Sequence, residues 1–236
     1  MTQNLQPAKP PTSIPLPGKT ITLTPLDPSH AAPLWTQVGG SSPQKTKTWT
    51  YLPEGPYPDT EYTTFQSSVA QKSKSKDPLF YAIIDNKSQE VKGWISLMSI
   101  VPEHLRCEIG WVLFSPGLQR TTGATEAAFL LLWYVFEELG YRRVEWKCNN
   151  LNGGSKRAAV RLGFTFEGVF REHMVVKGEN RDTAWFSLLR REWEGAVREA
   201  FVGWLDGTNF DEMGRQRRGL EAMRGEVAKG MESGRR

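Results

Sequence analysis

The stretch Glu108-Ile-Gly-Trp-Val-Leu-Phe114, then Ser-Pro-Gly-Leu118, then Gln119-Arg-Thr-Thr-Gly-Ala-Thr-Glu126, decides the fold. Its first part has the composition of a strand, and its last part opens an apolar helix at 124–139. A junction from strand to loop to helix gathers unpaired backbone N–H groups and the positive end of a helix dipole. Both favour an anion, and a pyrophosphate is a suitable one. The junction therefore predicts a phosphate-binding loop at residues 119–125.

Strand and helix patterns flank this junction on both sides. Before it, the sequence predicts a strand at 21–26, helices at 31–38 and 62–69, and an antiparallel meander of strands 80–84, 92–101 and 106–114. After it come the helix 124–139 closed by Gly140, a strand at 143–148, a helix at 155–162, and a hairpin of strands 164–176 and 183–189. Because a helix connects them, we expect strand 143–148 to run parallel to strand 106–114. The predicted fold class is α/β (α+β).

The two ends of the chain differ from this central domain, which we place at residues 19–193. Residues 1–18 contain five prolines, which predict a flexible Pro-rich N-terminus. Residues 194–236 are predicted as a C-terminal helical extension, whose first part is amphipathic and docks on the domain. We expect truncation near Asp206 to leave activity intact.

Composition excludes several classes of protein. The chain is 39% apolar and 24% charged, as in ordinary globular proteins. Its longest apolar run, 127–136, is shorter than the ~20 residues that span a bilayer. The first residues carry no apolar core of a secretory signal. We therefore predict a cytoplasmic protein with no membrane partner.

The number of cysteines and the net charge argue against a metal site and against a nucleic-acid partner. Cys107 and Cys148 are too few and too isolated for a disulfide framework or a zinc site, so no metal is expected. The formal net charge is only +4. Basic and acidic residues are mixed after Asp206, which predicts a solvated helix rather than a nucleic-acid partner.

Three motifs in order carry a resemblance to a known family. Gln119 to Ala124 lies where GNAT N-acetyltransferases have Q/R-x-x-G-x-G/A, with Thr122 in place of the first glycine. Asn152-Gly-Gly-Ser155 is similar to the N-x-x-S of the branch that acetylates ribosomal-protein N-termini, and Arg161-Leu-Gly-Phe-Thr-Phe-Glu-Gly168 to R/K-L-G-F-x-x-E-G. The chain therefore resembles the GNAT superfamily over residues 19–193. Since Thr122 carries a side chain, we expect its φ to be negative.

The resemblance implies a fold and a cosubstrate. The fold is a mixed, mostly antiparallel sheet of six to seven strands, flanked by helices, with a V-shaped splay between the fourth and fifth strands. The cosubstrate is acetyl-CoA, whose pantetheine arm lies in the splay. The residues implied in binding it are Leu113 and Phe114 through their backbone, Gln119, Arg120, Thr121, Thr122, Gly123, Ala124 and Thr125 of the loop, and Asn152.

Transfer of an acetyl group to an amine sets two chemical demands. An alkyl amine has a pKa near ~10, so a base must remove its proton at neutral pH. Glu108 is the first candidate, with a cross-strand ion pair as its alternative role; Asp182 is the reserve. A proton donor for the leaving thiolate is also needed. The sequence has no tyrosine after Tyr141, so Ser155 is the candidate, with helix capping as its alternative role.

The acceptor pocket is expected between the N-terminal helices. Trp49, Tyr51 and Tyr57 are the candidate wall residues, and core packing is the alternative for each. Arg171 and Arg181 are candidates for pairing with an acceptor carboxylate. The acceptor is a small-molecule or peptide amine, and a second copy of the chain is a further candidate partner. The rival function is a GNAT-fold module that binds acyl-CoA or a partner without turnover.

Overall fold

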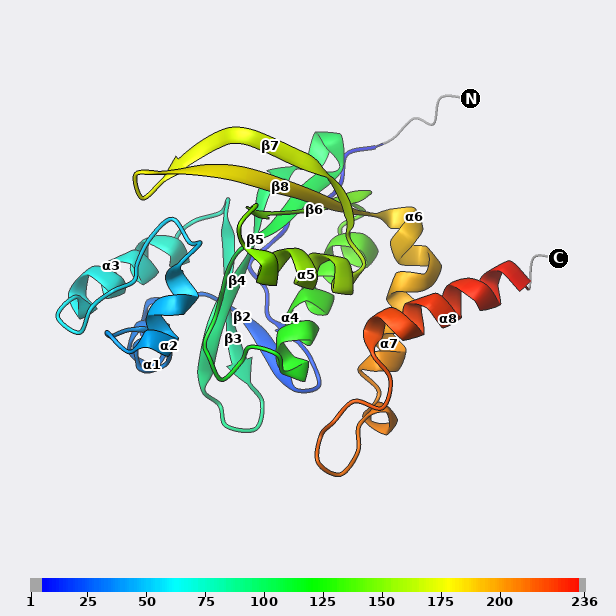
Figure 1. Cartoon of the computed structure of the whole chain (residues 1–236), viewed down its shortest axis with the longest axis horizontal. Coiled ribbons are helices and arrows are strands. Elements are labelled where there is room, and N and C mark those ends of the chain that lie inside the picture. The colour runs from blue at the N-terminus through cyan, green and yellow to red at the C-terminus, as the bar shows by residue number, and fades with distance from the viewer. Residues whose placement is uncertain (1–5, 234–236) are drawn as a thin grey trace.

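The computed structural model describes residues 6–233, which form one mixed sheet with helices on both faces (Figure 1). The strands are Leu16–Pro17 (β1), Ile21–Pro25 (β2), Leu79–Asp85 (β3), Val91–Val101 (β4), Arg106–Phe114 (β5), Arg143–Asn149 (β6), Thr165–Val176 (β7) and Glu179–Leu189 (β8). Their order is β1-β2-β3-β4-β5-β6-β8-β7. Only β5 and β6 pair in parallel, as predicted; every other neighbouring pair is antiparallel.

The strand count differs from the predicted six to seven. The sheet has eight strands because the Pro-rich N-terminal residues add the short strand β1 to the edge. Leu16 lies opposite Leu23 of β2, and the Gly18 amide donates to the Ile21 carbonyl at 2.9 Å. Proline is tolerated in such an edge strand because one side needs no ladder hydrogen bonds.

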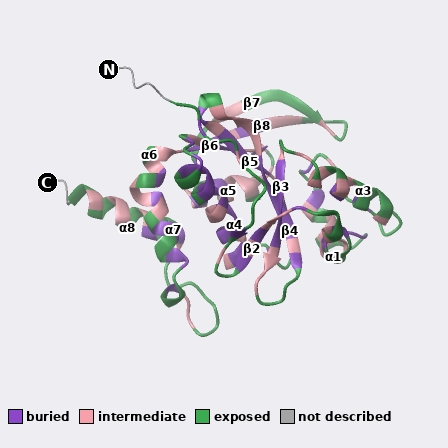
Figure 2. Cartoon of the chain, turned by 180° about the vertical axis from the view of Figure 1, so that it is seen from behind, coloured by how far each residue is buried: buried purple, intermediate pink, exposed green. Residues whose placement is uncertain are grey.

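Helices cover the two faces of the sheet in separate groups (Figure 1). They are α1 (Ala31–Val38), α2 (Pro43–Thr46), α3 (Tyr62–Ser73), α4 (Thr122–Trp133), α5 (Gly153–Leu162), α6 (Arg190–Glu192), α7 (Arg198–Trp204) and α8 (Leu220–Ser233). The sheet has a hydrophobic core on each face, and successive residues of β3 point alternately into one core and the other. Tyr81 and Ile83 pack on the α4 side, whereas Phe80 and Ala82 pack on the α1 and α3 side. Figure 2 shows the burial concentrated in the sheet and α4, with β7 largely exposed.

The predicted splay lies between β5 and β6. Their parallel register runs from Arg106 opposite Arg143 to Ile109 opposite Trp146 and then stops. On its other side, β5 stays paired with β4 as far as Phe114. The register of that pair shifts between Trp94 and Ser96, where Trp111 has a φ of +50°. An extra residue of this kind bends the strand that carries it, so β5 turns away from β6.

Segments near both ends of the described residues contact the domain. The amide of Ala8 donates to the Pro102 carbonyl at 3.0 Å, and that of Lys9 to the Leu139 carbonyl at 2.9 Å. At the other end, Leu220 and Met223 of α8 are buried in the same core as α4. This burial opposes the expectation that truncation near Asp206 is harmless, because truncation would uncover that part of the core. The boundaries at residues 18 and 193 stay predictions.

A buried carboxylate ties α4 to the turn between β1 and β2. Glu126 is only 2% exposed. Its Oε2 accepts from the amides of Thr20 (2.7 Å) and Ile21 (3.2 Å) and from the Thr20 hydroxyl, while its Oε1 accepts from the Lys19 amide. Buried charge is tolerated only with such hydrogen bonds. The contact fixes the first turn of α4 against the sheet edge.

We predict that Glu126→Gln lowers the free energy of unfolding by about 2–3 kcal/mol, because hydrogen bonds to a charged group contribute about 1.5–3 kcal/mol and the amide N–H₂ would face other donors. Urea unfolding followed by circular dichroism measures the change. Glu138→Gln, at an exposed position of the same helical segment, is the control and should change the free energy little. Equal effects of the two substitutions would contradict the role given to Glu126.

Candidate active site

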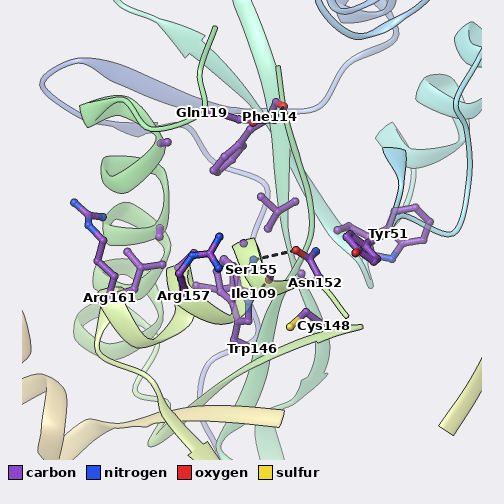
Figure 3. A pocket seen from close by; sticks show the side chains of 18 of the residues that line it. Tyr51, Ile109, Phe114, Gln119, Trp146, Cys148, Asn152, Ser155, Arg157 and Arg161 are labelled. Carbon is purple, nitrogen blue, oxygen red and sulfur yellow. Dashed lines mark hydrogen bonds between the residues drawn. The ribbon is translucent and has the colours of Figure 1, made fainter. Parts of the chain in front are cut away.

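A cleft of about 1760 Å³ opens where β5 and β6 separate. Figure 3 shows its side chains converging from β5, β6, α5 and the start of α4. Residues of the N-terminal segment and of the β7–β8 hairpin also line it, and so do some residues from the end of α7 onward. Those of the N-terminal segment are Gln44, Lys47, Thr48 and Thr50 to Pro53, and those from the end of α7 are Trp204, Phe210 and Gly214 to Gln216. The splay therefore joins segments from every part of the fold in one site.

The loop predicted to hold a pyrophosphate forms the entry to α4. Thr121 is the N-cap, and its hydroxyl accepts from the Ala124 amide at 3.3 Å. Thr122 is the first helical residue and has no positive φ, as expected; the left-handed residue is Arg120, with a φ of +63°. The amide of Gln119 donates to Ser115 and that of Thr121 to Leu118.

Three further amides of this loop keep their protons free. Within residues 6–233, no acceptor takes the amide protons of Arg120, Thr122 or Gly123. Gln119, Arg120, Thr121, Thr122, Ala124 and Thr125 all line the cleft. The start of α4 thus offers free donors and a helix dipole at the cleft, a combination suited to an anion.

Gly123 has a packing role that the motif did not indicate. It is buried against β2, and an added Cβ would lie 2.7 Å from Cγ2 of Ile21. Its side of the helix therefore faces the sheet, and Gly123 itself does not line the cleft. The absence of a side chain lets α4 approach the sheet closely.

The two β5 residues predicted to contact pantetheine differ in position. Phe114 lines the cleft, and its carbonyl accepts from Nε2 of Gln119 at 3.1 Å. Leu113 pairs with Trp94 and has a fully buried side chain outside the cleft lining. Trp111 and Val112, just before them, do line it.

The start of α5 supplies polar groups at the base of the cleft (Figure 3). Asn152, not Ser155, is the N-cap: its Oδ1 accepts from the Ser155 amide at 3.0 Å. The capping alternative for Ser155 is therefore wrong. The Ser155 hydroxyl instead accepts from Nε1 of Trp146 at 2.9 Å, which leaves its own proton free to donate. Burial raises the pKa of the adjacent Cys148 thiol, which keeps it protonated.

Glu108 lies at the cleft within a network of charges. Its Oε2 accepts from Nζ of Lys147 at 2.8 Å and from the Ser99 hydroxyl at 3.2 Å, so the cross-strand ion pair is present. Lys147 also pairs with Glu145 at 2.8 Å and lies 4.0 Å above the Trp185 ring. Burial raises the pKa of the Glu108 carboxyl, against the opposing effect of Lys147.

Asp182, the reserve base, lies outside the cleft lining. Its Oδ1 accepts from the Glu172 amide at 2.8 Å, next to a bulge of β7 where Glu172 has a φ of +49°. This hydrogen bond lowers the pKa of Asp182. The carboxylate supports the hairpin and does not face the reacting groups.

Two of the predicted wall aromatics belong to the core. Trp49 is fully buried, its Nε1 donates to the Val38 carbonyl at 2.9 Å, and its ring meets that of Tyr57 edge-on at 5.2 Å. Neither Trp49 nor Tyr57 lines the cleft. Core packing, the alternative role, is the one the structure shows for both.

Tyr51 and Lys177 connect the N-terminal segment to distant parts of the chain. Tyr51 lines the cleft, and its hydroxyl donates to the Leu151 carbonyl at 3.1 Å. Lys177, at the tip of the β7–β8 hairpin, donates to the Trp49 carbonyl at 2.8 Å. The N-terminal segment, the β6–α5 loop and the hairpin therefore meet at one side of the cleft.

The two candidate arginines separate. Arg171 is exposed on β7 beside a surface depression and does not line the cleft. Arg181 does line it, and its Nε donates to the Thr183 hydroxyl at 3.2 Å. Within residues 6–233 no carboxylate pairs with Arg181.

Several cleft residues were not predicted. They are Ser99, Trp146, Lys147, Arg157 and Trp204. A signal for Lys147 exists in the sequence: Glu145 and Lys147 share one face of a strand predicted to run parallel to that of Glu108. No comparable signal marks Trp204, because it lies beyond the region of resemblance.

A split mixed sheet, with free amides at a helix start and a buried carboxylate that line one cleft at the split, defines a class of acyl-group transferases. The sequence model of the acetyltransferase (GNAT) domain matches residues 20–165. The chain belongs to the GNAT acetyltransferase family, as predicted, and is an acetyl-CoA-dependent acyltransferase. Members of this family use acetyl-CoA as cosubstrate and act on amine acceptors.

Relatives agree with this assignment. A GCN5-related N-acetyltransferase from Brucella melitensis is 44% identical, with a TM-score of 0.90 over 95% of this chain and 100% of that one. The "Putative ribosomal N-acetyltransferase YdaF" of Bacillus subtilis (strain 168) is 28% identical over 74% of this chain and 94% of its own length. The ribosomal L7/L12 α-N-protein acetyltransferase RimL, at 21% identity and a TM-score of 0.62 over 74% of this chain and 93% of its own, shares the fold.

None of the helices within residues 6–233 combines the length and the apolar character that a bilayer crossing requires. In the same part of the chain, no group of three or more His, Cys, Asp or Glu side chains is arranged to hold a metal ion.

We predict that Gly123→Ala lowers the free energy of unfolding by about 1–3 kcal/mol, as overpacking typically does. The new methyl group would meet Ile21, and α4 would have to shift. Urea unfolding of the single variant measures the cost.

The same substitution in an Ile21→Ala background provides the control. There the methyl group has space, so the cost of Gly123→Ala should fall by about 1 kcal/mol or more, as expected for residues in contact. An unchanged cost in both backgrounds would contradict the close approach of α4 to β2.

Proposed function

We propose that this protein transfers the acetyl group of acetyl-CoA directly to a primary amine, of a protein N-terminus or a small molecule, in a ternary complex. The observation that carries the proposal is that Glu108 and the start of α4 line one and the same cleft. YdaF, to which the chain is similar, is named for ribosomal acetylation, and this supports a peptide amine as the acceptor.

The cleft residues fit acetyl-CoA by their donor set. The free amides of Arg120, Thr122 and Gly123 and the α4 dipole would hold its diphosphate. Beyond Ile109, the edge of β5 has no neighbouring strand on the β6 side, so backbone groups there can pair with the amides of a pantetheine arm. Asn152 uses its Oδ1 for the cap, which leaves its amide N–H₂ as a donor to that arm. Acetyl-CoA supplies the activated acyl carbon.

Glu108 is proposed as the base that takes a proton from the acceptor amine. Its raised pKa brings it closer to working pH than an ordinary carboxylate, which improves a general base. Lys147, 2.8 Å from the Glu108 carboxyl, opposes the effect of burial and favours the carboxylate form. Glu108 takes one proton from the ammonium form of the acceptor, directly or through water. The free amine then forms the new C–N bond as the C–S bond breaks, and its second proton passes through Ser155 to the departing thiolate.

Ser155 is proposed as the proton donor to the departing thiolate. Trp146 already donates to its oxygen, which orients the hydroxyl and polarises its proton. Tyr51 and Arg181 are proposed to contact the acceptor, because both line the cleft and Arg181 forms no ion pair with a carboxylate within residues 6–233. Arg171, remote from the cleft, is withdrawn from this role.

We predict that Glu108→Gln lowers kcat about 100-fold or more while CoA binding is unchanged, since a general base typically contributes about 10²–10⁴-fold. In the wild type, activity should fall as the pH is lowered through the raised pKa of Glu108, because protonation removes the base form. Release of free thiol at a series of pH values measures both effects.

Ser99→Ala provides the graded control. It removes a hydrogen bond that favours the Glu108 carboxylate, so the pKa of Glu108 should rise further and the acid limb should move to higher pH. An acid limb that persists unchanged in Glu108→Gln would remove this residue from the base role. Acetyl-CoA binding without any amine-dependent thiol release would support the non-catalytic alternative.

A pair of substitutions separates the two roles of Asn152. Asn152→Ala removes the cap, worth about 1 kcal/mol of stability, and also the amide donor. Asn152→Ser keeps a capping oxygen but lacks the N–H₂ group. We expect both variants to bind acetyl-CoA about fivefold more weakly, the effect of one neutral hydrogen bond. Titration calorimetry measures it, and normal affinity in Asn152→Ser would leave Asn152 with capping alone.

A further inference from the structure

The cleft extends past the part of the chain that matches the family. Its lining includes Trp204, Phe210, Arg215 and Gln216, all of which follow residue 193. Figure 3 shows Arg157 and Arg161 of α5 at one side of this cleft, and the Trp204 ring lies next to Arg161. The C-terminal extension therefore forms a wall of the site itself.

Direct contacts attach this wall to α4 and α5. Nη1 of Arg161 donates to the Thr125 hydroxyl at 2.9 Å, and its guanidinium carbon lies 4.9 Å from the Trp204 ring centroid. Trp204 in turn donates to Oε1 of Gln216 at 2.8 Å and meets Phe210 edge-on at 5.3 Å. One chain of contacts thus runs from the first turn of α4 to the loop after α7.

The charges on this side of the cleft are unbalanced. Arg157 and Arg161 both line it, and within residues 6–233 neither forms an ion pair with a carboxylate. Arg215, by contrast, is paired with Asp211 at 2.8 Å. Arg157 is exposed, whereas Arg161 is half-buried and positioned by Thr125 and Trp204. A guanidinium group without a carboxylate partner is suited to a phosphate, which matches its planar fork of donors.

The wall combines these two cations with aromatic surface. Proteins commonly bind a nucleotide through two kinds of contact: arginine side chains hydrogen-bond its phosphate, and an aromatic ring stacks on its base. The diphosphate proposed at the start of α4 is covalently followed, in coenzyme A, by an adenosine with a 3′-phosphate. With the diphosphate at the start of α4, the adenosine part would lie along one side of the cleft. The side formed by α5 and the C-terminal extension offers both kinds of contact.

We propose that the C-terminal extension completes the cosubstrate site. Phe210, supported by the buried Trp204, would face the adenine, and Arg157 with Arg161 would bind the 3′-phosphate, so that the protein distinguishes coenzyme A from its 3′-dephospho form. This inference rests on the proposed function. It gives the extension a binding role in addition to its packing role.

The experiment measures the Kd of CoA and of 3′-dephospho-CoA by titration calorimetry on the full chain. Wild type should bind CoA about tenfold more tightly, the effect of one charge-assisted hydrogen bond pair. Arg157→Gln should remove most of this difference by weakening CoA and leaving dephospho-CoA unchanged. Phe210→Ala should weaken both ligands about fivefold or more, as loss of base stacking does.

Two further variants separate binding from folding. Met213→Ala, at a 77% exposed position of the same loop, should change neither Kd. Phe210→Leu keeps apolar bulk beside Trp204 and loses the ring, so it should weaken both ligands with an unchanged melting temperature. Equal Kd values for the two ligands in wild type, or normal affinity in both Phe210 variants, would overturn the inference and leave the proposed function standing. If wild type binds neither ligand, the proposed function fails and the inference fails with it.

Discussion

The end of pairing between β5 and β6, after Ile109 and Trp146, is the constraint on which the rest of the structure depends. Up to that point the two strands share a parallel ladder; beyond it β5 follows β4 alone. The left-handed backbone of Trp111 maintains the bend, at a cost of about 1–2 kcal/mol for a residue with a Cβ. Contacts of its ring with Phe80 and Lys72 help to hold it there. The strain is thus stored where the sheet must open, as is common at functional sites.

Buried charge is organised differently on the two sides of the sheet. Glu126 has a purely structural environment, in which backbone amides and a hydroxyl satisfy its carboxylate. The Glu108 carboxylate has fewer hydrogen-bond partners. They are the Ser99 hydroxyl and Lys147, and Lys147 is shared with Glu145. Hydrogen bonds from Lys147 and Arg143 outweigh the effect of burial and lower the pKa of Glu145, whereas burial prevails at Glu108. Two glutamates next to each other across paired strands therefore differ in readiness to take a proton.

Features that the sequence pattern of a single segment determines could be predicted, and features that depend on contacts between distant segments could not. The helix after Gly123, the parallel strand 143–149 and the terminal hairpin each have a periodicity that a single segment displays, and all were predicted. The bend at Trp111 was not, because tryptophan gives no local indication of a left-handed backbone. Trp49 and Tyr57 lie on irregular backbone, where no period shows which side chain faces inward, so the sequence left a pocket wall and core packing as alternatives for each. Capping of α5 was the predicted alternative role of Ser155, but Asn152 is the cap; both residue types cap helices well, so the sequence does not choose between them. Trp204 lies at the cleft because the extension packs against α5, and the helical pattern of the extension does not indicate where it packs.

The bridges from Tyr51 to Leu151 and from Lys177 to Trp49 have a consequence for the size of what can react. They connect three separate segments on that side of the cleft and so restrict the approach from there. An amine at the end of a slender, unfolded arm would pass between such segments more easily than one set in a broad folded surface. Selection among amines would then begin with the shape of the carrier, before any group contacts the thioester.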